Sequence, residues 1–329
     1  MVSGRLTTRP GKPPRLLTSC SALASEGAAA PAARQSRFRG PCLALGLPQL
    51  LMAIALVATG LSPAWAAGTN AAKAATDAAP CKPVYLTLDT GHMAVAPMMA
   101  EVLNKHQVKV TFFAANERTQ TGDGSLGAEW ASWWKARAAE GHEFASHTWD
   151  HVYWRADLPV ANGEPPRFRM RPSAGPSEGK DLDWTAVQYC EEISKSAKRL
   201  ETITGKKTLP LFRAPGGKTS PALLAAAKSC GYEHVGWSPA GFLGDELASE
   251  KYPNDFLLKK ALRDVRSGDI LLAHLGIWSR KDPWAPKVLE PLITGLQSRG
   301  FCFKTLREHP QYKDWIEAQS GSAPAKPSK

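Results

Sequence analysis

Short apolar runs alternate with longer amphipathic segments from residue 84 to residue 306. The apolar runs are rich in β-branched and aromatic residues, which is typical of buried strands; they cover residues 84–88, 108–113, 143–146, 209–213, 234–237, 270–274 and 301–306. The segments between them have helical spacing and predict helices at residues 94–104, 129–139, 184–204, 221–229, 255–266 and 287–298. Seven strands alternating with helices predict an α/β fold of parallel β/α units, either a nearly closed barrel or an open doubly wound sheet.

The remaining segments carry different patterns. Residues 152–183 are rich in proline and glycine and predict a long irregular insertion that serves as a lid or binding surface. Residues 67–81 are small and polar, as in a flexible linker, and the main domain is expected over 82–309. Residues 310–329 predict a short helix and a disordered Ser/Pro/Lys-rich tail.

The first 66 residues have the pattern of a signal peptide with a long n-region. A continuous apolar run at residues 43–61 follows Arg37 and Arg39 and precedes the small-residue site Ala64-Trp65-Ala66. Cleavage after Ala66 would make the protein periplasmic or secreted. An uncleaved membrane anchor is the alternative, because about twenty apolar residues can span a bilayer.

Composition and charge narrow the function classes. The 329 residues are 43% hydrophobic and 22% charged, which indicates a globular rather than a disordered chain. The net charge is +11, but residues 1–66 hold seven basic residues against one acid, so the excess belongs mostly to the leader. We therefore expect no nucleic-acid partner, and no pattern implies a stable protein partner.

Four cysteines follow the leader: Cys81, Cys190, Cys230 and Cys302. An even number in an exported protein allows two disulfides. Cys81 precedes the first predicted strand and Cys302 lies in the last; these strands are neighbours if a barrel closes, which favours Cys81–Cys302 with Cys190–Cys230. Four buried free thiols are the alternative.

Polar residues follow four of the predicted strands, where parallel strands deliver catalytic side chains. They are Asp89, the pair His147 and His151, Arg213 and His274. The two histidines are four residues apart, so a helical turn would place both imidazoles where they could hold one metal ion. Each residue also has a purely structural reading, such as a helix cap for Asp89.

Four segments resemble the motifs of one family. Residues 87–92 (TLDTGH) are similar to T-F-D-D-G-P, 147–151 (HTWDH) match H-[ST]-x-x-H, 213–217 (RAPGG) match R-x-P-x-G, and 272–274 (LAH) match L-x-H. Over residues 82–308 the chain thus resembles polysaccharide deacetylases with a NodB homology domain, the fourth carbohydrate esterase family. The resemblance implies a distorted (β/α)7 barrel and a hydrolase of linear amides, which are carbon–nitrogen bonds other than peptide bonds.

The resemblance also implies roles. His147 and His151 would hold a divalent metal, usually zinc, Asp89 would be the general base, Arg213 would orient it, and His274 would protonate the leaving amine. A metal that activates water, together with one base and one acid, is what amide hydrolysis requires. The expected partner is an N-acetylated glycan, either peptidoglycan or a secreted exopolysaccharide.

Two departures weaken the match. Thr90 replaces the family's second aspartate, a metal ligand, so the metal should be held weakly unless Asp89 or His92 supplies a ligand. The fourth motif, D-x-x-D-W, is absent: residues 237–241 read WSPAG, and Asp245 is the nearest acid. A metal-independent amide hydrolase of the same fold and a glycan-binding protein without turnover therefore remain as alternatives.

Residues in the strand-end loops are candidates for substrate binding: Pro215, Gly216, Trp237 and Trp278. Flat indole rings in such loops suit stacking on pyranose faces, although either tryptophan could instead fill the core.

Overall fold

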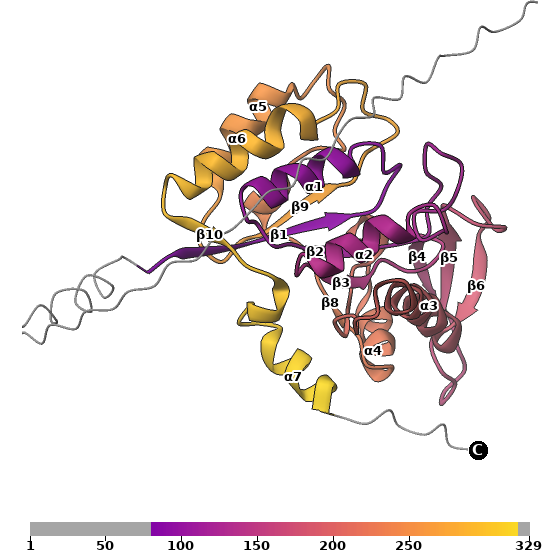
Figure 1. Cartoon of the computed structure of the whole chain (residues 1–329). Helices are drawn as coiled ribbons and strands as arrows, with labels where there is room; N and C mark the ends of the chain where they lie inside the picture. Colours follow the sequence, from indigo (N-terminus) through magenta and orange to yellow (C-terminus); the bar gives the residue numbers. More distant parts are fainter. Residues whose placement is uncertain (1–79, 322–329) are drawn as a thin grey trace, which may run out of the picture. The chain divides into compact units, whose positions relative to one another are not determined.

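Seven short parallel strands form the central sheet of this computed structural model, which describes residues 80–321 (Figure 1). The strands are β1 (Lys82–Asp89), β2 (Thr111–Ala114), β3 (Glu143–Ser146), β7 (Leu211–Phe212), β8 (Glu233–His234), β9 (Ile270–His274) and β10 (Phe301–Phe303). Their order is β10-β1-β2-β3-β7-β8, and β9 pairs with β1. Each strand lies where the hydrophobic pattern predicts one, so the α/β fold is confirmed.

The sheet curls toward a barrel because β1 is shared by three neighbours. The first half of β1 pairs with β10, and its second half pairs with β2 on one side and β9 on the other. Beyond β8 an irregular segment bonds to β9: the Ser238 amide donates to the Ile270 carbonyl at 3.1 Å, and the Leu243 amide to the Leu272 carbonyl at 3.3 Å. The result is a nearly closed, distorted barrel rather than an open sheet.

Within residues 80–321, seven helices and three short 3-10 turns surround the sheet. They are α1 (Ala96–Lys105), α2 (Ala131–Ala139), α3 (Ala186–Thr204), α4 (Pro221–Ser229), α5 (Asn254–Asp264), α6 (Ala285–Gln297), α7 (Lys313–Gly321), η1 (Pro215–Gly217), η2 (Pro239–Gly241) and η3 (Leu306–Glu308). The longest, α3, begins at a capping box formed by Thr185 and Gln188 and ends at Gly205, whose φ of 70° terminates the helix.

Alternation along β1 separates two cores. Leu86 and Leu88 belong to the outer core, to which buried residues of α1 and α6 contribute. Tyr85 belongs to the inner core, where Ile316 of α7 also packs. Successive side chains of a strand point to opposite faces of the sheet. Asp89 therefore lies on the same inner face as Tyr85, at the mouth of the barrel.

Residues 152–183 form a small antiparallel sheet, so the prediction of an irregular insertion is wrong. Its strands are β4 (Val152–Leu158), β5 (Arg167–Pro172) and β6 (Leu182–Thr185). Phe168 and Met170 alternate with arginines along β5 and pack in one cluster with Tyr189 and Ile193 of α3. The signal for this strand was present in the sequence, but the many prolines obscured it.

Both expected disulfides are present. Cys81 pairs with Cys302 and Cys190 pairs with Cys230, with Cα–Cα distances of 5.7 and 6.2 Å. The first ties the start of β1 to β10, and the second ties α3 to the end of α4. The predicted signal peptide, residues 67–79 of the predicted linker, and residues 322–329 lie outside the described residues. None of the helices within residues 80–321 has the length and apolarity to cross a membrane.

Candidate active site

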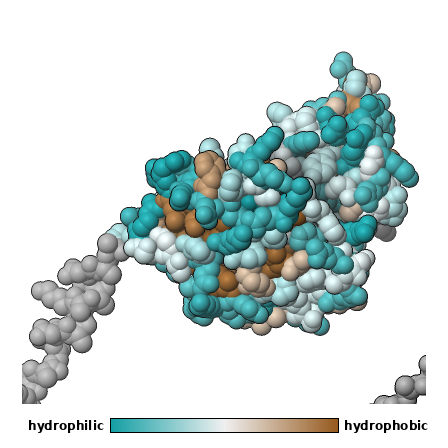
Figure 2. All heavy atoms as spheres, turned by 90° about the horizontal axis from the view of Figure 1, so that it is seen from above, coloured by the Kyte–Doolittle hydropathy of each residue, from teal (hydrophilic) through white to brown (hydrophobic). Residues whose placement is uncertain are grey.

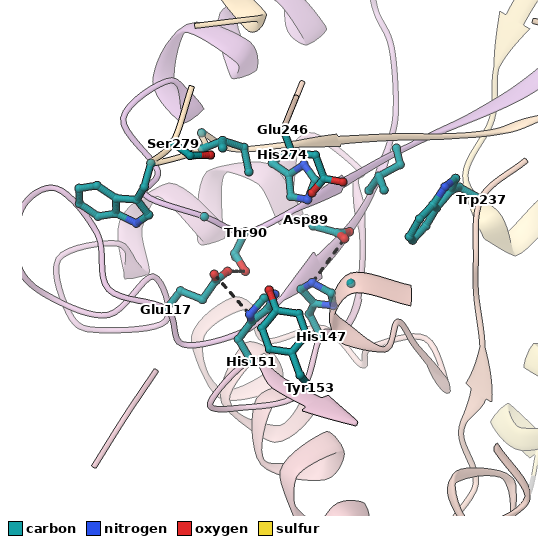
Figure 3. Close-up of a pocket in the computed structure, with 16 residues that line it drawn as sticks. Asp89, Thr90, Glu117, His147, His151, Tyr153, Trp237, Glu246, His274 and Ser279 are labelled. Carbon is teal, nitrogen blue, oxygen red and sulfur yellow. Dashed lines mark hydrogen bonds and ion pairs between the residues drawn. The ribbon is translucent and has the colours of Figure 1, made fainter. Parts of the chain in front are cut away.

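A cavity of about 310 Å³ opens at the C-terminal ends of the barrel strands (Figure 3). Four of the residues singled out from the sequence line it together: Asp89, His147, His151 and His274. They come from the ends of β1, β3 and β9 and from the loop after β3. The parallel fold therefore gathers residues that are up to 185 positions apart in the chain, as the strand-end pattern predicted.

Asp89 is held in a buried ion pair with Arg213. The Arg213 guanidinium is fully buried and donates to Asp89 Oδ1 at 2.6 Å and to the carbonyls of Val235 and Gly236 at 3.1 Å each. Burial alone would raise the pKa of Asp89, but Arg213, together with His147 and His274, outweighs burial and the pKa is lowered. Asp89 is therefore an ionised carboxylate at neutral pH, with Oδ2 left to face the cavity.

His274 rests on a second buried carboxylate, that of Asp245. His274 Nδ1 lies 3.1 Å from both Asp245 oxygens, and the backbone amide of His274 donates to Asp245 Oδ2 at 2.6 Å. Burial lowers the pKa of His274, but the nearby carboxylates, Asp245 foremost and then Asp89 and Glu246, together outweigh burial and raise the pKa to about 9. Asp245 thus supports His274 although the D-x-x-D-W motif is absent, so that support is not lost as the sequence suggested.

The backbone of residues 147–151 is a strained loop and not the predicted helical turn. Thr148 and His151 have φ values of 63° and 47°, in the left-handed region that β-branched and bulky residues avoid. The Thr148 hydroxyl accepts from the Val152 amide at 2.8 Å, which stabilises the loop. The imidazoles of His147 and His151 still meet, with ring centroids 4.8 Å apart.

Hydrogen bonds set the tautomers of both histidines. His147 Nδ1 lies 2.9 Å from the Arg213 carbonyl, which can only accept. His151 Nδ1 lies 2.6 Å from Ser173 Oγ, and that hydroxyl donates its own proton to the His151 carbonyl at 3.0 Å. Both Nδ1 atoms therefore carry the proton and both Nε2 atoms are free, as in histidine ligands of metals.

The donor set suits a cation. Burial lowers the pKa of His147 to about 4, so its imidazole is neutral at pH 7. Its free Nε2 faces Asp89 Oδ2 at 3.4 Å, which places two acceptors opposite each other. A divalent cation between such groups would satisfy both, and neutral imidazoles with a carboxylate are ligands that zinc accepts. Within residues 80–321, however, no three His, Cys, Asp or Glu side chains already stand as a metal cluster.

Thr90 is bonded to a carboxylate that the sequence analysis missed. Its hydroxyl donates to Glu117 Oε2 at 2.7 Å and accepts from the Ala115 amide at 3.0 Å. Glu117 follows β2, lines the same cavity, and has Oε1 3.8 Å from His151 Nδ1 (Figure 3). The only signal for Glu117 in the sequence was an acidic residue four positions after the strand predicted at residues 108–113.

His92 does not join the two histidines, so its proposed role as a ligand is not supported. Its amide donates to the Gly276 carbonyl at 3.2 Å, and its Nδ1 accepts from the Ala94 amide at 3.1 Å. The ring packs edge-on against Trp278 and lines a separate cavity of about 20 Å³. The chain passes so close to Gly276 at this turn that the imidazole is directed away from the larger cavity.

Three of the four predicted substrate-binding residues line the cavity: Gly216, Trp237 and Trp278. Pro215 is buried and does not line it. Gly216 has a φ of 63°, and a Cβ there would lie 2.9 Å from the ring of Tyr153 on β4. The small sheet thus supplies Tyr153 to the cavity, a contribution that an irregular insertion did not suggest.

The cavity continues into a neighbouring hollow of about 400 Å³. The two share Glu117, His151, Tyr153 and Trp278, so together they form an elongated site. The face drawn in Figure 2 is mostly hydrophilic, with its hydrophobic residues in small groups. Trp278 stands out on such a surface, because this large aromatic side chain lines the cavity and yet is 59% exposed.

The fold and the site together are typical of a hydrolase, because the mouth of the barrel carries the ionised carboxylate of Asp89, the protonated His274 and the paired imidazoles of His147 and His151. The comparisons with known proteins agree. The family model described as polysaccharide deacetylase matches residues 76–235. Residues 76–235 thus match the polysaccharide deacetylase family, as the sequence motifs predicted, and the predicted class, hydrolases of carbon–nitrogen bonds other than peptide bonds, agrees with this match.

The relatives are named deacetylases. A chitooligosaccharide deacetylase of Azorhizobium caulinodans is 26% identical over 233 residues, covering 68% of this chain and 92% of its own. The peptidoglycan-N-acetylmuramic acid deacetylase of Bacillus subtilis is 28% identical, covering 68% and 70%. A peptidoglycan-N-acetylglucosamine deacetylase of Bacillus cereus is 26% identical, covering 70% and 90%.

Solved structures support the fold. A peptidoglycan N-acetylglucosamine deacetylase in complex with an N-hydroxybenzamide superposes with a TM-score of 0.51 at 22% identity, covering 70% of this chain and 89% of its own. A family 4 acetyl xylan esterase from Clostridium thermocellum, in complex with a cobalt ion, gives 0.50 at 23% identity, covering 71% and 92%. At these identities the likeness concerns the fold alone.

Proposed function

We propose that this protein is an exported, metal-dependent deacetylase that removes N-acetyl groups from an amino-sugar polysaccharide, either peptidoglycan or an exopolysaccharide. The observation that carries the proposal is the pairing inside one cavity of Asp89, held ionised by Arg213, with His274, held protonated by Asp245. A base and an acid with these charge states at neutral pH are what amide hydrolysis requires. Their strands are adjacent, and Asp89 and His274 are register partners.

The proton transfers follow from these charge states. Asp89 Oδ2 accepts a proton from the attacking water, and Arg213 keeps the carboxylate in place and ionised before the reaction. His274, with its pKa raised to about 9, delivers a proton to the nitrogen that leaves as the C–N bond breaks. The products are acetate and a free amine, so one water molecule accounts for all the atoms.

His147 and His151 would hold the divalent cation, with zinc the expected ion. When bound, such a cation polarises the amide carbonyl and lowers the pKa of water toward about 7. The Nδ1 bonds of both histidines orient the rings and leave Nε2 free for the ion. The cobalt ion of the acetyl xylan esterase structure and the tautomers of the two histidines support this part of the proposal.

The elongated site supports a polymeric substrate. The adjoining hollow extends the cavity past Tyr153 and Trp278, which would accommodate a sugar beside the one that is deacetylated. The relatives named for chitooligosaccharide and peptidoglycan support the same substrate class. The predicted signal peptide and the two disulfides support export to the periplasm or beyond.

Thr90 is the observation that favours a second candidate, a metal-independent amide hydrolase, because it replaces a family ligand. A glycan-binding protein without turnover is disfavoured, since binding alone does not require Asp89 and His274 to be held in opposite charge states.

Acetate release tests the proposal. The purified protein is incubated with N-acetylglucosamine oligomers or peptidoglycan, with added zinc or with a chelator, beside an Asp89→Asn variant. We expect release that the chelator abolishes, that zinc restores and that the variant lacks. Release that is unaffected by the chelator would refute metal dependence, and glycan binding without release would leave only the binding role.

A further inference from the structure

One carboxylate at the cavity has no partner in the protein. Glu246 lines the cavity beside His274, and within residues 80–321 no group donates a hydrogen bond to its carboxylate (Figure 3). The other acids near the reacting position are engaged: Asp89 is bonded to Arg213, and Asp245 to His274. The proposed proton transfers leave Glu246 without a role. Its carboxylate is therefore available to a hydrogen-bond donor of the substrate.

The loop that carries Glu246 is anchored on both sides of this residue. Asp245, which precedes it, accepts from the His274 amide at 2.6 Å. The carbonyl of Leu247, which follows it, accepts from the buried guanidinium of Arg280. Glu246 itself is exposed. The protein thus presents a free carboxylate at a fixed place in the cavity without having to order a flexible segment.

The lining of the cavity offers no basic side chain to an acidic sugar. Among residues 80–321 no lysine or arginine lines it, and its protonated group, His274, already has a carboxylate partner. In the adjoining hollow, Arg118 lies over the ring of Trp278, 5.9 Å from the centroid, and Glu117 and Glu178 line the same hollow. A carboxylate on a sugar next to Glu246 would therefore remain unpaired by the side chains around it.

The place of Glu246 selects the part of the sugar that it meets. Figure 3 shows Glu246 and His274 on one side of the cavity, with His147 and His151 on the other. In the proposed function His274 protonates the nitrogen on C2 of the sugar, so Glu246 faces a carbon next to C2. C1 carries the glycosidic oxygen, which has no proton to donate, whereas C3 of N-acetylglucosamine carries a hydroxyl. A free carboxylate is a strong acceptor for that hydroxyl.

We propose that Glu246 is a specificity-determining residue that accepts a hydrogen bond from a free O3 hydroxyl and so selects N-acetylglucosamine over N-acetylmuramic acid. This inference rests on the proposed function and specifies its substrate. N-acetylmuramic acid carries lactic acid as an ether on O3, which removes the donated proton and adds a carboxylate with the same charge as Glu246. The lost hydrogen bond and the repulsion of like charges discriminate in the same direction.

Peptide-free peptidoglycan strands test the proposal, because N-acetylglucosamine and N-acetylmuramic acid alternate in them. The strands are incubated with the full protein and Zn²⁺, and mass spectrometry of the fragments identifies which sugar has lost its acetyl group. Burial raises the pKa of Glu246, so the assay is run at pH 8 to keep the carboxylate ionised. We expect N-acetylglucosamine to react at least about a hundredfold faster than N-acetylmuramic acid.

The Glu246→Gln variant keeps an acceptor oxygen but removes the charge. Its discrimination between the two sugars should fall about tenfold, since like charges no longer repel. Reduction of the lactyl carboxylate to an alcohol keeps the bulk of the group and also removes its charge. It should therefore raise the rate at that sugar about tenfold with the unsubstituted protein but little with Glu246→Gln, because the two changes remove the same interaction.

Glu250→Gln is the matched control. It removes the same charge from the same loop, but Glu250 is paired with Lys281 at 2.8 Å and does not line the cavity, so discrimination should be unchanged. Circular dichroism checks that both variants fold. Discrimination that is unchanged in Glu246→Gln, or lowered equally in Glu250→Gln, would overturn the proposal.

Two further outcomes keep this inference apart from the proposed function. If both sugars lose acetate at similar rates, the role of Glu246 fails and the deacetylase activity stands. If no glycan releases acetate, the activity fails, and calorimetric binding of N-acetylglucosamine oligomers and peptide-free strands tests Glu246 alone. A preference for the oligomers that Glu246→Gln narrows would then support its role, and equal binding would overturn it.

Discussion

Replacement of Asp245 by asparagine tests how the protein sets the charge of its acid. Burial lowers the pKa of His274, whereas Asp245 is the largest influence that raises it, and the balance places the pKa at about 9. Relative to the ordinary value of 6.5, this rise corresponds to about 3 kcal/mol in favour of the imidazolium. Asparagine retains an oxygen for the backbone amide of His274 but removes the charge.

The expected effect depends strongly on pH. With a pKa of about 9, His274 is mostly protonated at pH 8, whereas a pKa near 6.5 leaves about one molecule in thirty protonated. Asp245→Asn should therefore lower kcat/KM about thirtyfold at pH 8 but less than about twofold at pH 6. In the pH profile, the alkaline limb moves from about pH 9 toward pH 6.5.

The assay is acetate release from an N-acetylglucosamine oligomer between pH 5 and pH 10. Glu246→Gln is the control, because Glu246 ranks below Asp245 among the groups that raise the pKa of His274. It should move the alkaline limb less. An equal loss of activity at pH 6 and pH 8 in Asp245→Asn would refute this reasoning, because Asp245 would then act only by placing the ring.

Three other substitutions test separate parts of the structure. Asp89→Asn leaves the Arg213 guanidinium buried without its partner, so denaturant titration should show a loss of about 3–5 kcal/mol in the free energy of unfolding. Acetate release should fall about 10²–10⁴-fold, because the general base is lost. An unchanged free energy of unfolding would contradict the buried ion pair. Trp278→Ala should raise KM for oligomers about fivefold, or about 1 kcal/mol, with kcat retained; an unchanged KM would exclude stacking. Replacement of Cys190 and Cys230 by alanine opens a loop of sequence separation 40 and should cost about 2–4 kcal/mol in the same titration, with the reduced protein as reference.

The sequence predicted most of the fold because its signal is periodic. All seven parallel strands and six helices lie at the expected places, since buried strands and amphipathic helices differ in hydrophobic period. The small antiparallel sheet was missed because its strands are separated by proline-rich turns. Alternation on β5 is clear only once Phe168 and Met170 are seen to pack on α3.

The candidate site was predictable where one side chain follows one strand, and not where two segments meet. Asp89, Arg213 and His274 each lie at or directly after the end of a strand, so the strand pattern pointed to them. Asp245 and Glu117 act through partners that are 29 and 27 positions away, and no local pattern encodes such a pairing. The direction of His92 could not be predicted for the same reason, because it depends on the close approach of Gly276, which is distant in the sequence.

The disulfide between Cys81 and Cys302 lies at the start of β1, whereas Asp89 lies at the end of the same strand. An eight-residue strand is about 25 Å long, so the described chain enters the domain on the side opposite the cavity mouth. Anything fused or immobilised ahead of residue 80 therefore joins the domain on the side away from an incoming glycan. The disulfide to β10 fixes this entry point to the sheet. A force applied to the chain ahead of residue 80 would therefore act on the disulfide first, and not on Asp89 at the other end of β1.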